Sequence, residues 1–363
     1  MEQFVVSARK YRPRAFEQVV GQGHIAITLE NAVKSEKVAQ AMLFCGPRGV
    51  GKTTCARILA REINRHSMPD AAPDEDFAFN IYELDAASNN SVDDIRALTE
   101  QVRFAPQVGR YKVYIIDEVH MLSTAAFNAF LKTLEEPPAH AIFILATTEK
   151  HKILPTILSR CQIFDFRLIT VEDIRRHLEY IAADQGVEAE SEALHIIAQK
   201  ADGALRDALS IYDRVVSFCG KNLTATRVAE TLNVLDYNTY FTMMEHIMNA
   251  DIPQLMLQVD KILSDGYDAQ YMLAGLATHI RDLLVARDAR TTVLLTVPED
   301  VKQRYISQAQ TLDYSNATDA LTLLSDTLSE YRASKAQRLL TEICLMRLAS
   351  LGLDPSKKKV LTT

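Results

Sequence analysis

The stretch FCGPRGVGKTTCARILA, residues 44–60, holds three glycines, with a lysine and two threonines directly after the last. Residues 46–53 match the pattern G-x-x-x-x-G-K-[ST] in full, between a strand-like run and a helix-like run. Glycines let backbone N–H groups turn towards phosphate oxygens, and a helix N-terminus adds positive potential. In such a loop, Lys52 reaches the outer phosphates and Thr53 holds Mg²⁺. We therefore expect a nucleotide to bind at Gly46, Pro47, Arg48, Gly49, Val50, Gly51, Lys52, Thr53 and Thr54.

The run KVYIIDE, residues 112–118, supplies the acidic groups that such a loop needs. A buried strand that ends in Asp117 places a carboxylate where it can bind Mg²⁺ directly or through water. Glu118 follows, where it can polarise an attacking water. An Asp-Glu pair at this place indicates hydrolysis of the nucleotide rather than transfer of its phosphoryl group.

Three further stretches carry polar residues near expected element ends. Thr147 and Thr148 end the apolar run 141–148, which we expect to lie beside the phosphate loop. Arg160, within Ser-Arg-Cys, precedes the next strand on a short helical segment, and Arg206 begins a helix in the helical half of the chain. Taken singly, a Thr-Thr pair after a strand is usually a turn, and a lone arginine is usually a solvated charge.

The elements that must position these residues follow an α/β pattern up to about residue 170. Strand-like runs cover residues 41–46, 80–87, 111–118, 141–148 and 161–166. Several of these runs are apolar without alternation, which predicts strands buried on both faces and hence a parallel sheet. Helical stretches lie between them. One begins at Ser91 with Asp94 three residues on, close to a capping box, and another begins at Ser123 and stops at Pro137.

The strand signal fades after residue 170. A helix runs from Thr170 to Gly186, and two more end at Gly203 and Gly220. Beyond residue 232 the pattern stays helical, with longer segments such as 271–289 and 320–348. We expect three domains: an α/β core at 1–168, a small helical domain at 169–232 and a longer helical domain at 233–363.

The composition excludes several classes of protein. The 363 residues are 48% hydrophobic and 24% charged, as in a globular protein, and no apolar run is long enough for a membrane span. The first residues lack the apolar core of a secretory signal, so we expect a cytoplasmic protein. The net charge of −7 implies that any DNA contact is a local basic patch. The cysteines contain no Cys-x-x-Cys pair and are expected to be reduced thiols; they are Cys45, Cys55, Cys161, Cys219 and Cys344.

Together with YRPRAFEQVVGQ (11–22) and FNAFLKTLEEPP (127–138), these motifs resemble the clamp-loader branch of the AAA+ ATPases, and within it the gamma/tau subunits of bacterial DNA polymerase III. The resemblance covers essentially the whole chain. It implies an α/β P-loop core with a parallel sheet, then a helical lid and a helical collar. It also implies ATP and Mg²⁺ as ligands. The partners that it implies are other loader subunits in a pentameric ring, the sliding clamp and primed DNA.

The resemblance also implies roles for single residues. The loop residues Gly46, Gly51, Lys52 and Thr53 fall on the phosphate site, Asp117 on the Mg²⁺-binding acid and Glu118 on the water-activating acid. Thr148 matches a polar sensor, Arg206 a second-domain sensor of the γ-phosphate, and Arg160 an arginine finger that completes a neighbour's site. Arg12, Pro13 and Val20 match the segment near the adenine. Arg96 and Arg103 are candidates for DNA contact, although a solvated helix face explains either one alone equally well.

The sequence departs from the family in two places. Most bacterial relatives carry a four-cysteine zinc module where this chain has residues 64–80, which contain no cysteine. The acidic and imidazole groups there are a poor set for structural zinc, so zinc is not expected; they are His66, Asp70, Asp74 and Asp76. The longer relatives also continue into domains that bind the helicase and the polymerase. Whether Thr363 is a natural end, a truncation or the end of a paralogue stays open, as do a longer form and the copy number in the ring.

Two alternative functions remain. One is another AAA+ DNA-processing ATPase, such as a branch-migration or recombination motor, but those proteins lack the Ser-Arg-Cys finger and the collar. The other is a non-catalytic scaffold subunit of the loader. Such subunits usually have a decayed phosphate loop, whereas Lys52 and the pair Asp117–Glu118 are intact here.

Overall fold

The computed structural model describes residues 5–69, 71–72, 75–295 and 297–351. The chain forms two compact units. The first comprises Met1–Gly186 and Ile197–Arg214, and the second comprises Val187–Ile196 and Val215–Thr363. The finer division into three domains, with boundaries near residues 168 and 232, remains a prediction. Within the described part of the chain, no helix combines the length and the apolar character needed to cross a bilayer.

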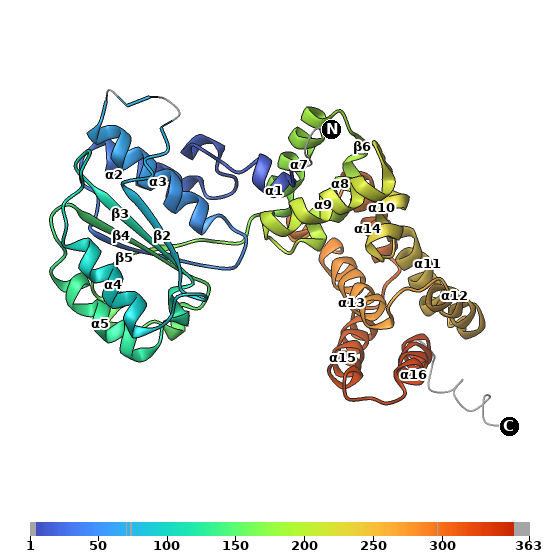
Figure 1. The fold of residues 1–363 in the computed structure, drawn as a ribbon. Coiled ribbons are helices and arrows are strands. Elements are labelled where there is room, and N and C mark those ends of the chain that lie inside the picture. The colour runs from blue at the N-terminus through green and yellow to red at the C-terminus, as the bar shows by residue number, and fades with distance from the viewer. Residues whose placement is uncertain (1–4, 70, 73–74, 296, 352–363) are drawn as a thin grey trace. The chain divides into compact units, whose positions relative to one another are not determined.

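A five-stranded parallel sheet is the centre of the first unit (Figure 1). Its strands stand in the order β2-β3-β4-β1-β5, and every neighbouring pair is parallel. All five predicted strands are confirmed to within two residues at each end. They are β1 Ala41–Cys45, β2 Ile81–Asp85, β3 Lys112–Asp117, β4 Ala141–Thr147 and β5 Gln162–Asp165.

Helices cover both faces of this sheet, as the unbroken apolar runs predict. Alternate residues of β1 point to opposite faces: Met42 and Phe44 pack with α2 and α3, whereas Leu43 packs with α4 and α5. Figure 1 shows the sheet between these two pairs of helices. The pairs are α2 Gly23–Lys34 with α3 Lys52–Ser67, and α4 Val92–Val102 with α5 Thr124–Glu135.

The predicted caps begin these helices. Ser91 and Asp94 form a complete capping box at α4, and the Ser123 side chain accepts the N–H of Ala126 at α5. Thr170 caps α7, Val171–Gln185, which ends at Gly186 in the left-handed conformation. The local signals therefore fix where these helices start.

The segment before β1 is tied to helices that follow the sheet. The backbone N–H of Ser7 donates to Asp213 Oδ2 of α9, Leu205–Cys219, at 2.7 Å, and the Tyr11 hydroxyl donates to Asp184 Oδ2 of α7 at 2.5 Å. These contacts hold residues 7–11 beside α7 and α9. The other helical elements of the unit are α1 Ser7–Lys10, η1 Phe16–Gln18, η2 Val119–Met121, η3 Lys150–Lys152 and α6 Pro155–Leu158; α8 Ser191–Lys200 and α9 Leu205–Cys219 each have residues in both units.

The second unit is almost entirely helical. An aspartate side chain caps four of its helices, at Asp236, Asp251, Asp268 and Asp313, and each accepts a backbone N–H of the first turn. A short parallel pair, β6 Glu188–Ala189 with β7 Asn222–Leu223, was not predicted, because two residues are too few to show a strand pattern. The helices are α10 Ala225–Leu232, α11 Tyr237–Met248, α12 Ile252–Ser264, α13 Ala269–Ala286, η4 Thr292–Leu294, α14 Glu299–Ala309, α15 Tyr314–Tyr331 and α16 Gln337–Ser350.

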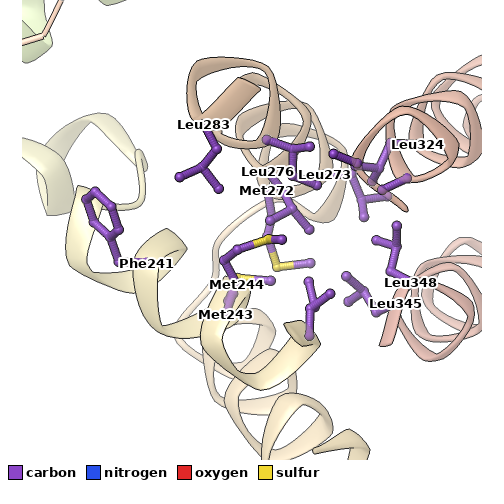
Figure 2. Packing of buried hydrophobic residues seen from close by; sticks show 14 of the residues in the cluster. Phe241, Met243, Met244, Met272, Leu273, Leu276, Leu283, Leu324, Leu345 and Leu348 are labelled. Atoms are coloured by element: carbon purple, nitrogen blue, oxygen red, sulfur yellow. The ribbon is translucent and has the colours of Figure 1, made fainter. Parts of the chain in front are cut away.

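One hydrophobic core joins the long helices of this unit. Leu273 and Leu276 of α13 are fully buried, and Leu324, Leu345 and Leu348 of α15 and α16 pack in the same core. Figure 2 shows these leucines from the different helices gathered around one interior. The unit therefore has a core of its own, separate from the two layers around the sheet.

The helical segment expected over residues 320–348 is interrupted by a turn. The chain turns between Tyr331, the last residue of α15, and Gln337, the first of α16. In the turn, the Ser334 hydroxyl accepts the N–H of Ala336 at 3.2 Å, and Gln337 Nε2 donates to the carbonyl oxygen of Tyr331. A straight helix would carry Leu345 away from α13, so burial of the second half favours the turn, although no glycine or proline marks it.

A buried histidine lies in the second core. His279 is 1% exposed, with Nδ1 2.9 Å from the Tyr305 hydroxyl and Nε2 3.0 Å from Gln308 Oε1. Burial lowers the pKa of His279 to about 4, against the opposing effect of the Gln308 bond and with a smaller contribution from Arg304. The folded protein therefore holds His279 neutral.

This neutral histidine predicts acid sensitivity. Because the unfolded chain takes up the proton first, the stabilisation is complete above pH 6.5 and is lost as the pH falls towards 4. The expected loss is about 1.4 kcal/mol of unfolding free energy per pH unit inside that window. Urea unfolding of the parent and of His279→Gln at several pH values measures it, and His151→Gln, at an exposed surface position, is the control. Parallel pH curves for the parent and His279→Gln would contradict the assignment.

Candidate nucleotide site

The pocket formed by the phosphate loop lies at the carboxyl edge of the sheet. The register pairs Cys45 with Thr147 and Ile116 with Leu145, so the loops after β1, β3 and β4 leave the sheet at one edge. Many of the predicted residues line this pocket: Arg12, Pro13, Val20, Arg48, Gly49, Val50, Gly51, Lys52, Thr53, Thr54, Asp117, Glu118 and Arg206.

Two glycines give the loop its path. Gly51 precedes α3 with a φ of 104°, and Gly49 has a φ of 77°, both in the region that favours glycine. A Cβ added to Gly49 would lie 3.0 Å from the Cβ of Ala204. The backbone of the loop therefore approaches the start of α9 closely, and the N–H of Arg206 points at the carbonyl of Gly49, 3.4 Å away.

The side chain of Lys52 is held by the first residues of the phosphate loop. Its Nζ donates to the carbonyl oxygens of Gly46 and Pro47, both at 2.7 Å, and the residue is only 6% exposed. Burial lowers the pKa of Lys52, while the carboxylates of Glu118 and Asp117 act in the opposite direction. A buried cation beside two acids fits a site that binds a phosphate chain.

The first acid of the pair meets the loop threonine. The Thr53 hydroxyl donates to Asp117 Oδ2 at 2.6 Å, so both oxygens face the same point of the pocket. Hydroxyl and carboxylate oxygens suit Mg²⁺, which keeps several waters and shares phosphate oxygens. Among the described residues, no group of three or more His, Cys, Asp or Glu side chains gathers to hold a metal by protein alone. The donor set therefore fits Mg²⁺ that is held together with a bound nucleotide.

Glu118 stands in an unusual backbone conformation. Its φ of 47° lies in the left-handed region, which few residues other than glycine adopt. Its Oε2 accepts the N–H and the hydroxyl of Thr148 from the end of β4, at 3.3 and 3.0 Å. The structure thus joins the predicted acid to the predicted polar sensor. Backbone strain of this kind clusters at functional sites.

Several pocket residues were missed from the sequence. They are aliphatic or aromatic positions, which carry no chemical signal of their own: Ala8, Tyr11, Val19, Ile169, Leu205 and Leu209. Gln22 was also missed as a single residue. It is fully buried, and its Nε2 donates to the carbonyl of Arg167 at 2.7 Å and approaches that of Val50 at 3.5 Å. The sequence signal for a buried Gln22 was its position directly after the apolar residues Val19 and Val20 and a glycine.

Arg160 is not among the residues that line this pocket. It follows α6, and its guanidinium donates to Glu135 Oε1 at 2.7 Å and to the carbonyl of Thr156 at 2.6 Å. The DNA candidates lie on α4. Arg96 is exposed and 3.5 Å from Asp93, and Arg103 is the exposed residue at the helix end. The structure brings neither of them to the pocket.

Two basic residues of the interval without cysteines contact glutamates outside it. Arg65 Nη1 lies 3.0 Å from Glu62 Oε1. His66 Nε2 lies 3.5 Å from Glu36 Oε1. Asp76 accepts the N–H of Ala78, while Asp70 and Asp74 lie outside the described residues.

Burial raises the pKa of Cys45 to about 11, of Cys55 to about 12 and of Cys161 to about 11. These three thiols are therefore protonated at neutral pH, the form that does not ligate metals.

Three family models match successive parts of the chain. The "DNA polymerase III, delta subunit" model covers residues 21–170, the "DNA polymerase III clamp loader subunit, ATPase lid domain" model covers 173–221, and the "DNA polymerase III subunits gamma and tau domain III" model covers 223–363. Among solved structures, the RuvB Holliday junction branch migration motor of Thermotoga maritima matches with a TM-score of 0.50 and 22% identity, over 71% of this chain and 89% of that one. That likeness shows the fold alone.

Relatives that match nearly all of this chain identify the family. The tau subunit of DNA polymerase III from Bacillus subtilis is 37% identical over 350 residues, which cover 94% of this chain and 62% of that protein. The gamma subunit from Buchnera aphidicola is 30% identical over 96% of this chain and 99% of its own length. The fold and the site thus define a P-loop protein of the AAA+ class, in which an α/β core is followed by a lid segment and further helices. The chain belongs to the gamma/tau subunit family of DNA polymerase III.

Removal of the loop cation tests the site. Lys52→Ala is expected to weaken ATP binding by roughly 10- to 100-fold, because a hydrogen bond to a charged group is worth about 1.5–3 kcal/mol. Titration calorimetry with ATP and Mg²⁺ measures the change. Lys34→Ala, on the exposed face of α2, is the matched control. Equal affinity of Lys52→Ala and the parent would place the nucleotide elsewhere.

Proposed function

We propose that this chain is an ATP-hydrolysing subunit of a replicative clamp loader, which opens the sliding clamp and closes it around primed DNA. The observation that carries the proposal is the complete polar set of one pocket, in which Lys52, Asp117 and Glu118 stand together. Membership of the gamma/tau family supports the assignment to DNA replication. The chain spans 62% of the length of the Bacillus subtilis relative. The proposal therefore covers only functions that residues of this chain can perform, and not those of the unmatched part of that relative.

Each polar group has a defined task in hydrolysis. Lys52 neutralises the outer phosphates of ATP. Thr53 and Asp117 would hold Mg²⁺, which would supply further positive charge to the phosphate oxygens. Glu118 orients the attacking water and accepts its proton, and Thr148 keeps the Glu118 carboxylate in place. On the nucleotide's other side, Arg12, Pro13 and Val20 line the part of the pocket assigned to the adenine.

Two arginines are assigned to the γ-phosphate from different chains. Arg206 lines the chain's own pocket from the first turn of α9. Arg160 does not line that pocket. It follows α6 in the sequence, and its guanidinium donates to Glu135 and to the carbonyl of Thr156. We assign Arg160 to the site of a neighbouring subunit in the ring. Such an arginine supplied in trans raises hydrolysis by about 10³–10⁵-fold.

The assembly that this role needs is a ring of five loader subunits. Leu339, Ile343 and Met346 lie on one side of α16 at helical spacing and are exposed in the isolated chain. This apolar side supports association through the collar. The sliding clamp and primed DNA complete the set of partners, with Arg96 and Arg103 as the DNA candidates on an otherwise acidic protein.

Two rival functions differ in measurable ways. A scaffold subunit would not hydrolyse ATP, whether or not it binds it. A branch-migration motor would be stimulated by four-way junctions, and the likeness to RuvB at 22% identity does not favour it beyond fold. A clamp loader is expected to hydrolyse ATP faster when both the clamp and primed DNA are present.

Glu118→Gln separates binding from hydrolysis. The amide keeps the shape of the side chain but cannot accept a proton, so turnover should fall by about 10²–10⁴-fold. ATP affinity should stay close to that of the parent. Steady-state turnover with clamp and primed DNA, and a binding titration, measure the two quantities. Glu30→Gln on α2 is the control, and parental turnover by Glu118→Gln would remove Glu118 from the mechanism.

A mixing experiment tests the position of Arg160. Arg160→Ala should spare the chain's own ATP affinity while stopping hydrolysis next door, and Lys52→Ala should lose its own site. In mixed rings, an intact loop on the first variant meets an intact Arg160 on the second, so part of the turnover should return. Arg176→Ala, an exposed arginine of α7, is the control for loss of charge. If correctly assembled mixtures are no more active than the separate variants, Arg160 does not act in trans.

A further inference from the structure

A histidine next to the proposed catalytic pair lies between two carboxylates. His120, on the turn η2 after β3, has a side chain that is only 7% exposed. Its Nε2 lies 3.0 Å from Glu149 Oε2, and its Nδ1 lies 3.0 Å from Thr147 Oγ1 and 3.4 Å from Glu118 Oε2. The imidazole therefore connects the end of β3 with the end of β4, inside the same unit.

The chemistry of these partners fixes the ring. An ionised carboxylate only accepts, so Nε2 carries a hydrogen and donates a hydrogen bond to Glu149. The Thr147 hydroxyl oxygen already accepts the N–H of Glu149 at 3.0 Å, which leaves its hydrogen for Nδ1. When Nδ1 also carries a proton, it donates to Thr147 or Glu118 instead. In either form the ring is held at both nitrogens in one orientation.

The imidazole of His120 faces Oε2 of Glu118, the carboxylate oxygen that Thr148 also contacts. Oε2 accepts two hydrogen bonds from Thr148 and faces His120 Nδ1. Among the contacts of the described residues, Oε1 has no such protein partner, so it is the oxygen available to a water. A carboxylate tied at one oxygen is oriented at the other.

We propose that His120 is a positioning residue for Glu118, and that Glu149 acts through it. Glu149 orients the imidazole. In the form with a proton on Nδ1, the ring donates towards Oε2 and together with Thr148 holds that oxygen, so that Oε1 meets the attacking water. This inference rests on the proposed hydrolysis of ATP, and it adds residues to that site which do not line the pocket. Glu149 is fixed in turn by Lys152, whose Nζ donates to it at 2.8 Å and lowers the pKa of the carboxyl.

The chain offers graded variants of this contact. His120→Leu removes both ring nitrogens and keeps a side chain of similar volume. His120→Asn keeps an amide near the place of Nδ1, facing Thr147 and Glu118, but it does not reach Glu149. Glu149→Gln keeps the shape and weakens the orientation. His151→Leu is the matched control, because His151 is the neighbouring exposed histidine, 3.9 Å from Glu149.

Turnover and binding of ATP by the full chain with Mg²⁺ are measured separately. His120→Leu is expected to lower kcat by about 10- to 100-fold, as misplacement of a reacting group does, with KM and ATP affinity within about twofold of the parent. His120→Asn and Glu149→Gln should fall between His120→Leu and the parent. His151→Leu should match the parent.

A double variant distinguishes positioning from a merely structural role. If His120 acts through Glu118, then His120→Leu in a Glu118→Gln background costs no further activity. A parental kcat for His120→Leu, an equal loss in both backgrounds, or a loss confined to ATP affinity would each overturn the inference. If His120→Leu does not fold, His120→Asn and Glu149→Gln carry the same comparison. Parental turnover by Glu118→Gln alone would instead overturn the proposed function.

Discussion

The parallel pairing of β1, β3 and β4 decides which side chains can meet in this protein. Parallel strands end at the same edge, so the phosphate loop, the pair Asp117–Glu118 and the threonines of β4 leave the sheet together. A shift of one residue in this register would turn Thr147 and its neighbours to the opposite faces of the sheet. The two apolar layers around the sheet oppose such a shift, because alternate residues of β1, β3 and β4 are buried on both sides.

The remaining walls of the pocket come from segments that are distant in sequence. Ser7 and Tyr11 are tied to α9 and α7 through Asp213 and Asp184, and Gln22 ties the following segment to the loop after β5. These polar contacts are few and specific. They bring Tyr11 and Val19 to the same pocket as Leu205 and Leu209, which adds apolar side chains to the lining of the pocket.

The sequence was informative where a residue type is restricted by its chemistry or its backbone. Lys52, Asp117 and the five strands follow from such restrictions, and so does the capping box at Ser91. The pocket positions Ile169 and Leu209 could not be predicted, because an aliphatic residue looks the same in a core and in a binding wall. The turn before α16 also escaped, since burial of Leu345 and not a local signal decides it. The roles of Arg160, Arg206, Arg96 and Arg103 remain predictions.

The left-handed backbone of Glu118 has a consequence for protein engineering. At a φ of 47° a side chain costs about 1 kcal/mol or more, which glycine would recover. Replacement of Glu118 by glycine would therefore relieve local strain and, in the proposed chemistry, remove the group that activates water. A search for heat-resistant variants that ignored turnover would be drawn to this position. Thermal stability and turnover place opposite demands on the same residue.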